Sequence, residues 1–230
     1  MSDASFMKIL ALEFSSSQRS VAVVQAKATG FPLQVSEVVE TGGIGTKPLA
    51  MVEAALRQAQ LEREQIECLA VGLGPGSYNG VRTAIALAQG WQLAVGVKLL
   101  GLSSAECIAA EAQSEGLIGQ VAVLIDAQRG DFYRAVYEIS ASDYKEREPL
   151  ALTSASDVTA RHQAGERLIG PEVLNRFADF RVVFPRAGVL GRLAVGRCDF
   201  VPGEQLEPIY LRPTTFVKAA APGIVSGPAR

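Results

Sequence analysis

The sequence predicts an α/β protein whose mixed sheets are covered by helices. Three strand patterns open the chain, and helical and strand patterns then alternate, which is typical of sheets with helices packed on their faces. A second hairpin pattern begins like the first, with an apolar strand that ends in an acidic residue, Glu13 in one case and Asp126 in the other. This similarity indicates a weak internal duplication.

The first elements indicate an antiparallel start. Residues 7–14 form an apolar run typical of an interior strand, and residues 20–25 resume the strand pattern after a polar turn, which predicts a hairpin. A third strand is expected at residues 33–40. Pro48 suits the first turn of a helix that runs to about residue 60.

A glycine-rich stretch at residues 71–82, VGLGPGSYNGVR, organises this half of the chain. It follows a short strand pattern at residues 68–71 and leads into a helical pattern at residues 81–95. Glycines allow close approach of the backbone to a ligand or to another segment, and the N-terminus of a helix attracts anions. A tight strand-to-helix turn and a binding loop are both compatible with this stretch.

The familiar phosphate and nucleophile motifs do not fit the stretch. After Gly74 and Gly76, Gly80 comes one residue too late for a dinucleotide fingerprint, and the lysine of a Walker loop is missing. Ser77 lacks the flanking glycines of a hydrolase nucleophile elbow. The spacing therefore excludes these three kinds of site.

The remaining elements continue the alternation. The patterns predict strands at residues 97–100, 120–126, 132–138 and 167–169, and helices from Ser103, at residues 154–162 and at residues 189–195. The tail after Lys218 is rich in Ala, Gly and Pro, and we expect it to be poorly ordered.

Composition narrows the function classes. The formal net charge of the 230 residues is -2, which offers no general attraction for nucleic acid. The three cysteines are scattered, so we expect neither a disulfide framework nor a thiolate zinc site. This cysteine usage predicts a protein of the reducing cytoplasm. We find no pattern of a signal peptide or membrane span.

Few residues suit catalysis. The sequence contains one histidine, His162, in a weakly patterned region without a serine elbow, which argues against a Ser-His-Asp hydrolase. The carboxylates Glu13, Asp126 and Asp131 remain candidates for acid-base chemistry.

Four segments stand out along the chain: KILALE at residues 8–13, GPGSYNGVR at residues 74–82, DAQRGDFY at residues 126–133 and PIYLR at residues 208–212. They resemble the TsaB (YeaZ) family, the dimerisation subunits of the bacterial machinery that makes threonylcarbamoyladenosine on tRNA. The segments occur in the matching order, and the resemblance runs from about Met7 to Lys218.

The resemblance implies an actin-like fold of the sugar kinase, Hsp70 and actin superfamily, with two ribonuclease-H-like lobes of which the second is reduced. We expect residues 1–115 to form the first lobe, with the glycine loop and a contact helix. Residues 116–230 would form the reduced second lobe, with a flexible tail from about residue 219.

The resemblance further implies an accessory subunit without catalytic activity of its own. It would bind and support TsaD, the paralogue that transfers threonylcarbamoyl to the tRNA adenosine next to the anticodon, with the ATPase TsaE as a further partner. Alone it would form a homodimer, and tRNA would be contacted through the complex. TsaD is expected to hold a metal with two histidines of one helix and an aspartate, a site that this chain cannot build. No cofactor is firmly implied, although ATP or ADP is a candidate at a subunit interface.

The candidate residues follow from these segments. Partner contact or loop residues are Gly74, Pro75, Gly76, Ser77, Tyr78, Gly80, Val81, Arg82, Ile85 and Ala88, and candidate nucleotide or cleft residues are Glu13, Ser15 and Asp126. No metal ligand is assigned. The apolar residues of the predicted contact helix could equally pack against the chain's own sheet, an alternative that stays open.

Three departures from the family pattern bear on nucleotide binding. The usual Asp-Thr after the first strand is Glu13-Phe14, the usual Phe-Thr of the loop is Tyr78-Asn79, and Gln128 replaces the Arg of Asp-Ala-Arg. Glu13 is longer than the usual Asp, and Phe14 is bulkier than the usual Thr. This difference favours the interpretation of Glu13 as an ordinary strand-end carboxylate over a nucleotide-binding role. A stand-alone actin-fold ATPase or small-molecule kinase remains the alternative function.

Overall fold

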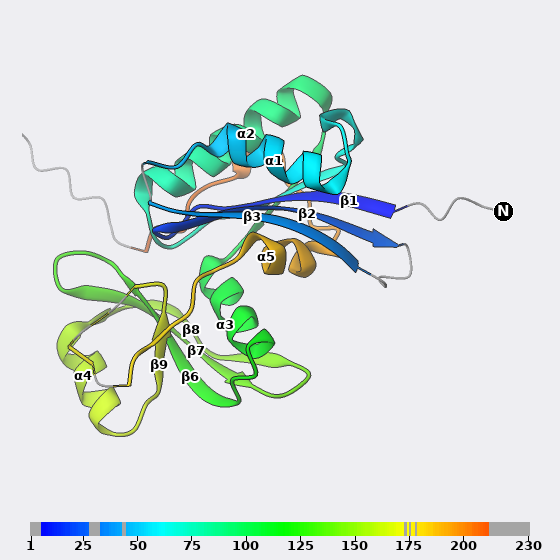
Figure 1. Ribbon diagram of the computed structural model, residues 1–230. Coiled ribbons are helices and arrows are strands. Elements are labelled where there is room, and N and C mark those ends of the chain that lie inside the picture. The colour runs from blue at the N-terminus through cyan, green and yellow to red at the C-terminus, as the bar shows by residue number, and fades with distance from the viewer. Residues whose placement is uncertain are drawn as a thin grey trace, which may run out of the picture.

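The computed structural model describes residues 6–27, 33–42, 45–172, 174, 176, 177 and 179–211. Two five-stranded sheets, each covered by helices, form two lobes (Figure 1). Arg212 and the tail predicted to be flexible from about residue 219 lie outside the described residues.

The first sheet contains the predicted hairpin. Its strands are β1 (Phe6–Glu13), β2 (Gln18–Lys27), β3 (Leu33–Thr41), β4 (Cys68–Gly72) and β5 (Lys98–Leu102). They lie in the order β3-β2-β1-β4-β5, with β1 antiparallel to β2, β2 antiparallel to β3, and β4 parallel to both β1 and β5. The antiparallel start and the mixed character of the sheet are therefore confirmed.

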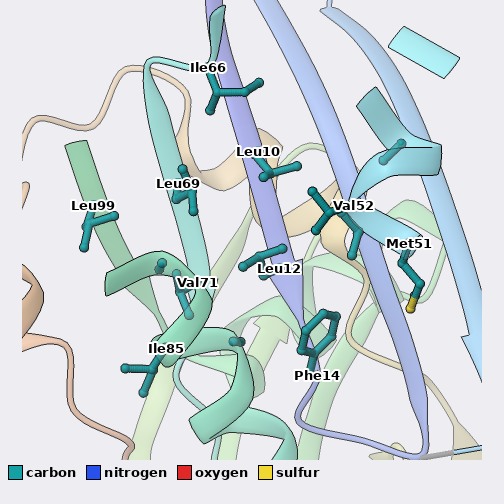
Figure 2. Close-up of a cluster of buried hydrophobic side chains, with 14 of the residues drawn as sticks. Leu10, Leu12, Phe14, Met51, Val52, Ile66, Leu69, Val71, Ile85 and Leu99 are labelled. Atoms are coloured by element: carbon teal, nitrogen blue, oxygen red, sulfur yellow. The ribbon is translucent and has the colours of Figure 1, made fainter. Parts of the chain in front are cut away.

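Alternation along β1 divides the core of this lobe. Leu10 and Leu12 are fully buried beneath α1 (Pro48–Ala59) and α2 (Tyr78–Val95) (Figure 2). Ile9 points to the opposite face, which is covered by α5 (Ala187–Ala194). Successive side chains of a strand point to opposite faces, and Figure 1 shows the resulting helix-sheet-helix layers.

The second sheet repeats this topology. Its strands are β6 (Gly119–Asp126), β7 (Asp131–Ile139), β8 (Tyr144–Ser154), β9 (Leu168–Gly170) and β10 (Arg181–Val182). The order is β10-β9-β6-β7-β8, again with two antiparallel neighbours on one side and parallel neighbours on the other. The internal duplication is confirmed, and the chain has the two-lobed actin-like α/β fold.

Strand β8 was not predicted from the sequence. It lies at the edge of its sheet, and most of its side chains are exposed or half-buried, so no alternation of apolar and polar residues marks it. Pro149 falls where the pairing with β7 changes register, and edge strands and bulges are where a sheet tolerates proline. The composition of this strand therefore resembles that of a loop.

Two further helices lie around the second sheet. Helix α3 (Ser104–Ser114) begins after its N-cap Ser103, and its Ile108 packs with the apolar residues of β6 and β7. Cys107 of the same helix contacts the cluster around α5. Helix α4 (Ala155–Gln163) covers the other face through Val158. Short 3-10 helices span Arg63–Gln65 and Gly203–Gln205.

The predicted boundary of the second lobe, residues 116–230, requires correction. The chain returns to the first sheet at α5, where Arg186 pairs with Glu37 and the amide of Ala187 donates to Ser20 Oγ at 2.8 Å. Farther on, Leu206 is buried in the core of the first lobe. These contacts join segments more than 140 residues apart, so local sequence patterns could not reveal them.

No helix within the described parts of the chain has both the length and the apolar character that crossing a membrane requires.

Candidate functional site

The glycine stretch packs directly on the turn between β1 and β2. A Cβ atom at Gly76 would lie 2.1 Å from the carbonyl oxygen of Ser15, and one at Gly80 would lie 1.9 Å from that of Phe14. The amide of Ser77 donates to the Ser15 oxygen at 2.6 Å. These glycines therefore serve close packing of backbone on backbone, which favours the tight-turn interpretation of the stretch.

The start of α2 is fixed by its cap and by an aromatic cluster. Ser77 is the N-cap, and its Oγ accepts from the amide of Gly80 at 3.3 Å. Tyr78 stacks on Tyr210 with ring centroids 5.9 Å apart, and Arg82 lies over the Tyr78 ring and donates to the Tyr210 hydroxyl at 3.3 Å. The glycine loop and the C-terminal segment, two of the segments singled out in the sequence, thus meet in space.

Glu13 is enclosed within the first lobe. Its side chain is fully buried, with Oε1 accepting from the amide of Ser15 at 2.8 Å and Oε2 from the hydroxyl of Ser104 at 2.9 Å. A Cβ at Gly72 would lie 2.1 Å from Oε2, so only glycine leaves room for the carboxyl. The Ser104 hydroxyl in turn accepts from the amide of Gly74. Glu13 thereby ties β1 to the glycine stretch, which favours its interpretation as a strand-end carboxylate.

Burial gives Glu13 a testable pH signature. Loss of water around the carboxyl raises the pKa of Glu13 above 4.5, although hydrogen bonds from Ser15 and Ser104 oppose this rise. Because the folded state holds the proton more tightly than the unfolded state, the Glu13 contribution to stability should fall as the pH rises above about 4.5. Glu13→Gln cannot ionise and should lack this fall.

Urea denaturation of the wild type and of Glu13→Gln at pH 5 and pH 8 measures this difference. Between pH 5 and pH 8, the free energy of unfolding of Glu13→Gln should rise relative to that of the wild type. Glu53→Gln, which alters an exposed carboxyl of α1, is the control. A constant difference between Glu13→Gln and wild type would contradict the assignment.

A cleft of about 510 Å³ lies between the lobes. The described residues that line it are Ser15, Ser16, Ser17, Gly76, Ser77, Tyr78, Asp126, Ala127, Gln128, Tyr133, Glu172 and Tyr210. Five predicted residues are therefore brought together here: Ser15, Gly76, Ser77, Tyr78 and Asp126. Glu13 and the α2 residues beyond Tyr78 are not among those that line the cleft.

Asp126 occupies the position that corresponds to Glu13. Its Oδ1 accepts from the amide of Gln128 at 2.7 Å, the same two-residue spacing as between Glu13 and Ser15. Unlike Glu13, Asp126 lines the cleft. The two predicted carboxylates therefore end equivalent strands but only Asp126 faces the space between the lobes.

Glu172 was missed in the sequence because no motif surrounds it. It follows β9 and lines the cleft, and its pKa is raised because nearby protein removes water from the carboxyl and Asp126 adds negative charge. Two carboxylates on the second lobe thus face serine hydroxyls and the start of α2 on the first. Hydroxyls and helix amides can bind an anionic group and carboxylates a cation, although the described residues contain no cluster of three or more metal-binding side chains.

His162 has a structural environment. Its Nδ1 lies 3.0 Å from the carbonyl oxygen of Glu166, and its ring packs edge-on against Phe177. It does not line the cleft. A backbone carbonyl and an aromatic ring are thus its contacts, as is usual for a structural histidine.

The contact residues proposed on α2 require correction. Val81, Ile85 and Ala88 are buried in the core of the first lobe. Figure 2 shows Ile85 in this cluster with Leu69 and Val71 of β4. Side chains enclosed in this way cannot also form the surface of a subunit contact. For these residues the alternative interpretation, packing on the chain's own sheet, describes the structure.

A different face of α2 is exposed. Ala86, Gly90, Leu93 and Ala94 are all exposed, and Leu93 is 89% accessible. Their spacing places them on one side of the helix. We call these four residues the outer stripe of α2; it presents small side chains and one large apolar side chain to solvent.

Comparison with known proteins relates this chain to tRNA-modification proteins. The family described as "TsaD: tRNA N6-adenosine threonylcarbamoyltransferase" matches residues 47–195, which is more than half of the chain. The TsaB protein of Escherichia coli, named a tRNA threonylcarbamoyladenosine biosynthesis protein, is 31% identical over 132 residues, and the TsaB protein of Bacillus subtilis is 26% identical over 133.

The matched segment covers 57% of this chain in both cases, and 55% and 56% of the two relatives. The chain thus spans little more than half the length of these curated relatives. The solved structure "YeaZ from Pseudomonas aeruginosa" superposes with a TM-score of 0.73 at 25% identity, covering 89% of this chain and 99% of that one.

Proposed function

Because this chain belongs to the TsaD family and, within it, to the TsaB (YeaZ) proteins, we propose that it is a cytoplasmic, non-catalytic subunit. It would bind and support TsaD. TsaD would transfer threonylcarbamoyl to the tRNA adenosine next to the anticodon, and TsaE would join the same assembly. Contact with tRNA would come through the complex, and the chain alone would form a homodimer.

The outer stripe of α2 is the observation that carries this proposal. Ala86 and Gly90 leave the backbone of α2 open to close approach by a helix of another subunit. Leu93, at 89% accessible, adds apolar area that is costly to leave in water. One surface would serve in turn for the homodimer and for TsaD.

The absence of catalysis by this subunit is supported by the environment of Glu13. In a metal- and nucleotide-binding cleft this strand-end acid would have to face the ligand, whereas here both oxygens accept hydrogen bonds inside the first lobe. The chain also contains one histidine, so that a site built on two histidines requires another subunit.

Substitution of the stripe tests the contact. Ala86→Arg places a charged side chain where a partner helix would pack, and we expect at least about a hundredfold loss of TsaD capture because the charge would be buried without a partner. Capture and tRNA modification can be measured with purified TsaD, TsaE and tRNA. Ala151→Arg, at an exposed position of β8, is the matched control.

Two outcomes would contradict the proposal. Full tRNA modification without this chain would remove the supporting role itself. Wild-type capture of TsaD by a folded Ala86→Arg variant would remove the outer stripe from the contact and leave the supporting role to another surface.

Nucleotide binding forms part of the same proposal. ATP or ADP is expected to bind at the contact between the subunits, so that neither subunit alone holds it as tightly. Equilibrium dialysis of labelled ADP against this chain, TsaD and their mixture distinguishes the cases. Equal binding by the isolated chain would contradict an interface site.

The cleft favours a second candidate, a stand-alone ATPase or small-molecule kinase. Ser15 and Asp126 line one cavity of about 510 Å³, large enough for a small ligand. This candidate requires the purified chain to turn over ATP, and Asp126→Asn to abolish turnover while the fold persists. Absence of ATP turnover by the purified chain would eliminate it.

A further inference from the structure

Arg19 of β2 is buried without full pairing. The residue is 4% accessible, its Nη1 donates to the hydroxyl of Thr46 at 3.1 Å, and its Nε–H has no acceptor among the residues that the structure describes. It forms no ion pair with a carboxylate among the described residues. The ring of Phe14, 5.6 Å from the guanidinium carbon, covers one side of the group.

Such an environment is unusual for arginine. Buried donors in folded proteins nearly always have acceptors, and an exception calls for a bound group or a functional reason. Burial lowers the pKa of Arg19, which reflects the loss of water without a compensating negative charge. The Arg19 guanidinium is therefore suited to bind an anion.

The start of α1 lies next to this guanidinium. Thr46 immediately precedes Lys47, the N-cap of α1, whose side chain makes no capping hydrogen bond, and the first turn contains no acidic residue. The first amide bonded to the N-cap is that of Met51, so the amides of Leu49 and Ala50 have no acceptor within the helix. These N–H groups and the helix dipole favour negative charge at this end.

One carboxylate of this chain competes for the same position. Glu40 of β3 lies opposite Arg19 of β2 in the strand register. Its carboxyl accepts a hydrogen bond from the amide of Lys47 at 3.4 Å and forms no ion pair with the Arg19 guanidinium. Among the described residues, and leaving out the two chain neighbours of Gly45, no heavy atom lies within 4 Å of the position that a Cβ of Gly45 would occupy. The described residues therefore leave space beside Gly45.

We propose that Arg19, the Thr46 hydroxyl and the first amides of α1 bind a phosphate group. The ligand is inorganic phosphate or the phosphate of a small phosphomonoester, held by charge-assisted hydrogen bonds from the guanidinium. The site is separate from the interlobe cleft and does not depend on the proposed subunit role.

Titration of the full chain tests the site. Calorimetric titration with sodium phosphate, against sodium chloride at equal ionic strength, should give saturable binding, and phenyl phosphate in a second titration distinguishes a monoester ligand from the free ion. Arg19→Met should weaken phosphate binding by about tenfold or more, since it removes a charge-assisted contact. Arg57→Met, at an exposed position of α1 far along the helix from its first turn, is the control and should leave phosphate binding unchanged.

Two further variants separate binding from folding. Thr46→Val keeps the shape of the side chain and removes the hydroxyl, so phosphate binding should weaken even if Arg19→Met does not fold. Glu40→Gln removes the competing negative charge and should tighten binding. The proposal is overturned if the wild type binds phosphate no better than chloride, or if Thr46→Val and Glu40→Gln bind phosphate as the wild type does.

Discussion

Replacing Gly80 with alanine is expected to lower the free energy of unfolding by about 3 kcal/mol. The added methyl carbon would lie 1.9 Å from the carbonyl oxygen of Phe14, far inside contact distance, and that oxygen belongs to the backbone. The clash can be relieved only if α2 moves away from the turn that follows β1. Such a movement would also disturb the hydrogen bond between Ser77 and Ser15.

Urea denaturation of the isolated chain at low protein concentration measures this loss. Gly90→Ala is the matched control, because Gly90 lies on the same helix and a Cβ there would meet no heavy atom within 4 Å. Alanine at this exposed position should stabilise the helix by about 0.5 to 1 kcal/mol. Equal effects of the two substitutions would show that the glycines are not selected by packing.

Local patterns were enough to predict most of the fold. The hairpin strands β1, β2, β6 and β7 are marked by apolar runs around polar turns, and the glycine stretch marks the passage from β4 to α2. Each of these signals lies within a few consecutive residues. The repeat of a strand ending in Glu13 or Asp126 could for the same reason be predicted, and it corresponds to the equivalent first strands of the two sheets.

Contacts between distant segments could not be predicted in this way. The return of α5 to the first sheet depends on Arg186 and Glu37, and no sequence signal links two residues that are 149 positions apart. Glu172 joins Asp126 at the cleft only because the second sheet folds as it does. Both features come from topology and not from a motif.

The error in the contact residues has a physical explanation. Val81, Ala84, Ile85 and Ala88 recur at the spacing of one helix face, and they are all buried. Apolar residues at this spacing are expected to face the chain's own core, and the remaining positions face outward. The phase of these residues around the helix therefore determines that they point toward the sheet.

Replacing Ile85 with arginine is therefore expected to unfold the protein. Ile85 is 6% accessible and packs with Leu69 and Val71, so the substitution places an unpaired charge in an apolar core and loses the packing of the isoleucine. The cost should exceed about 4 kcal/mol, a large fraction of the stability of a typical domain. Circular dichroism should show no cooperative thermal transition at the wild-type temperature.

The adjacent substitution Ala86→Arg gives the sharpest control, because successive residues of a helix point about 100° apart. Ala86 is exposed, so Ala86→Arg should have the melting temperature of the wild type and lose only the capture of TsaD. If Ile85→Arg remained folded and failed to capture TsaD, the contact would have to include the face that the structure buries, and α2 would have to leave its own sheet to form it. Loss of folding at position 85 with loss of capture at position 86 would instead divide α2 into a core face and a contact face one residue apart.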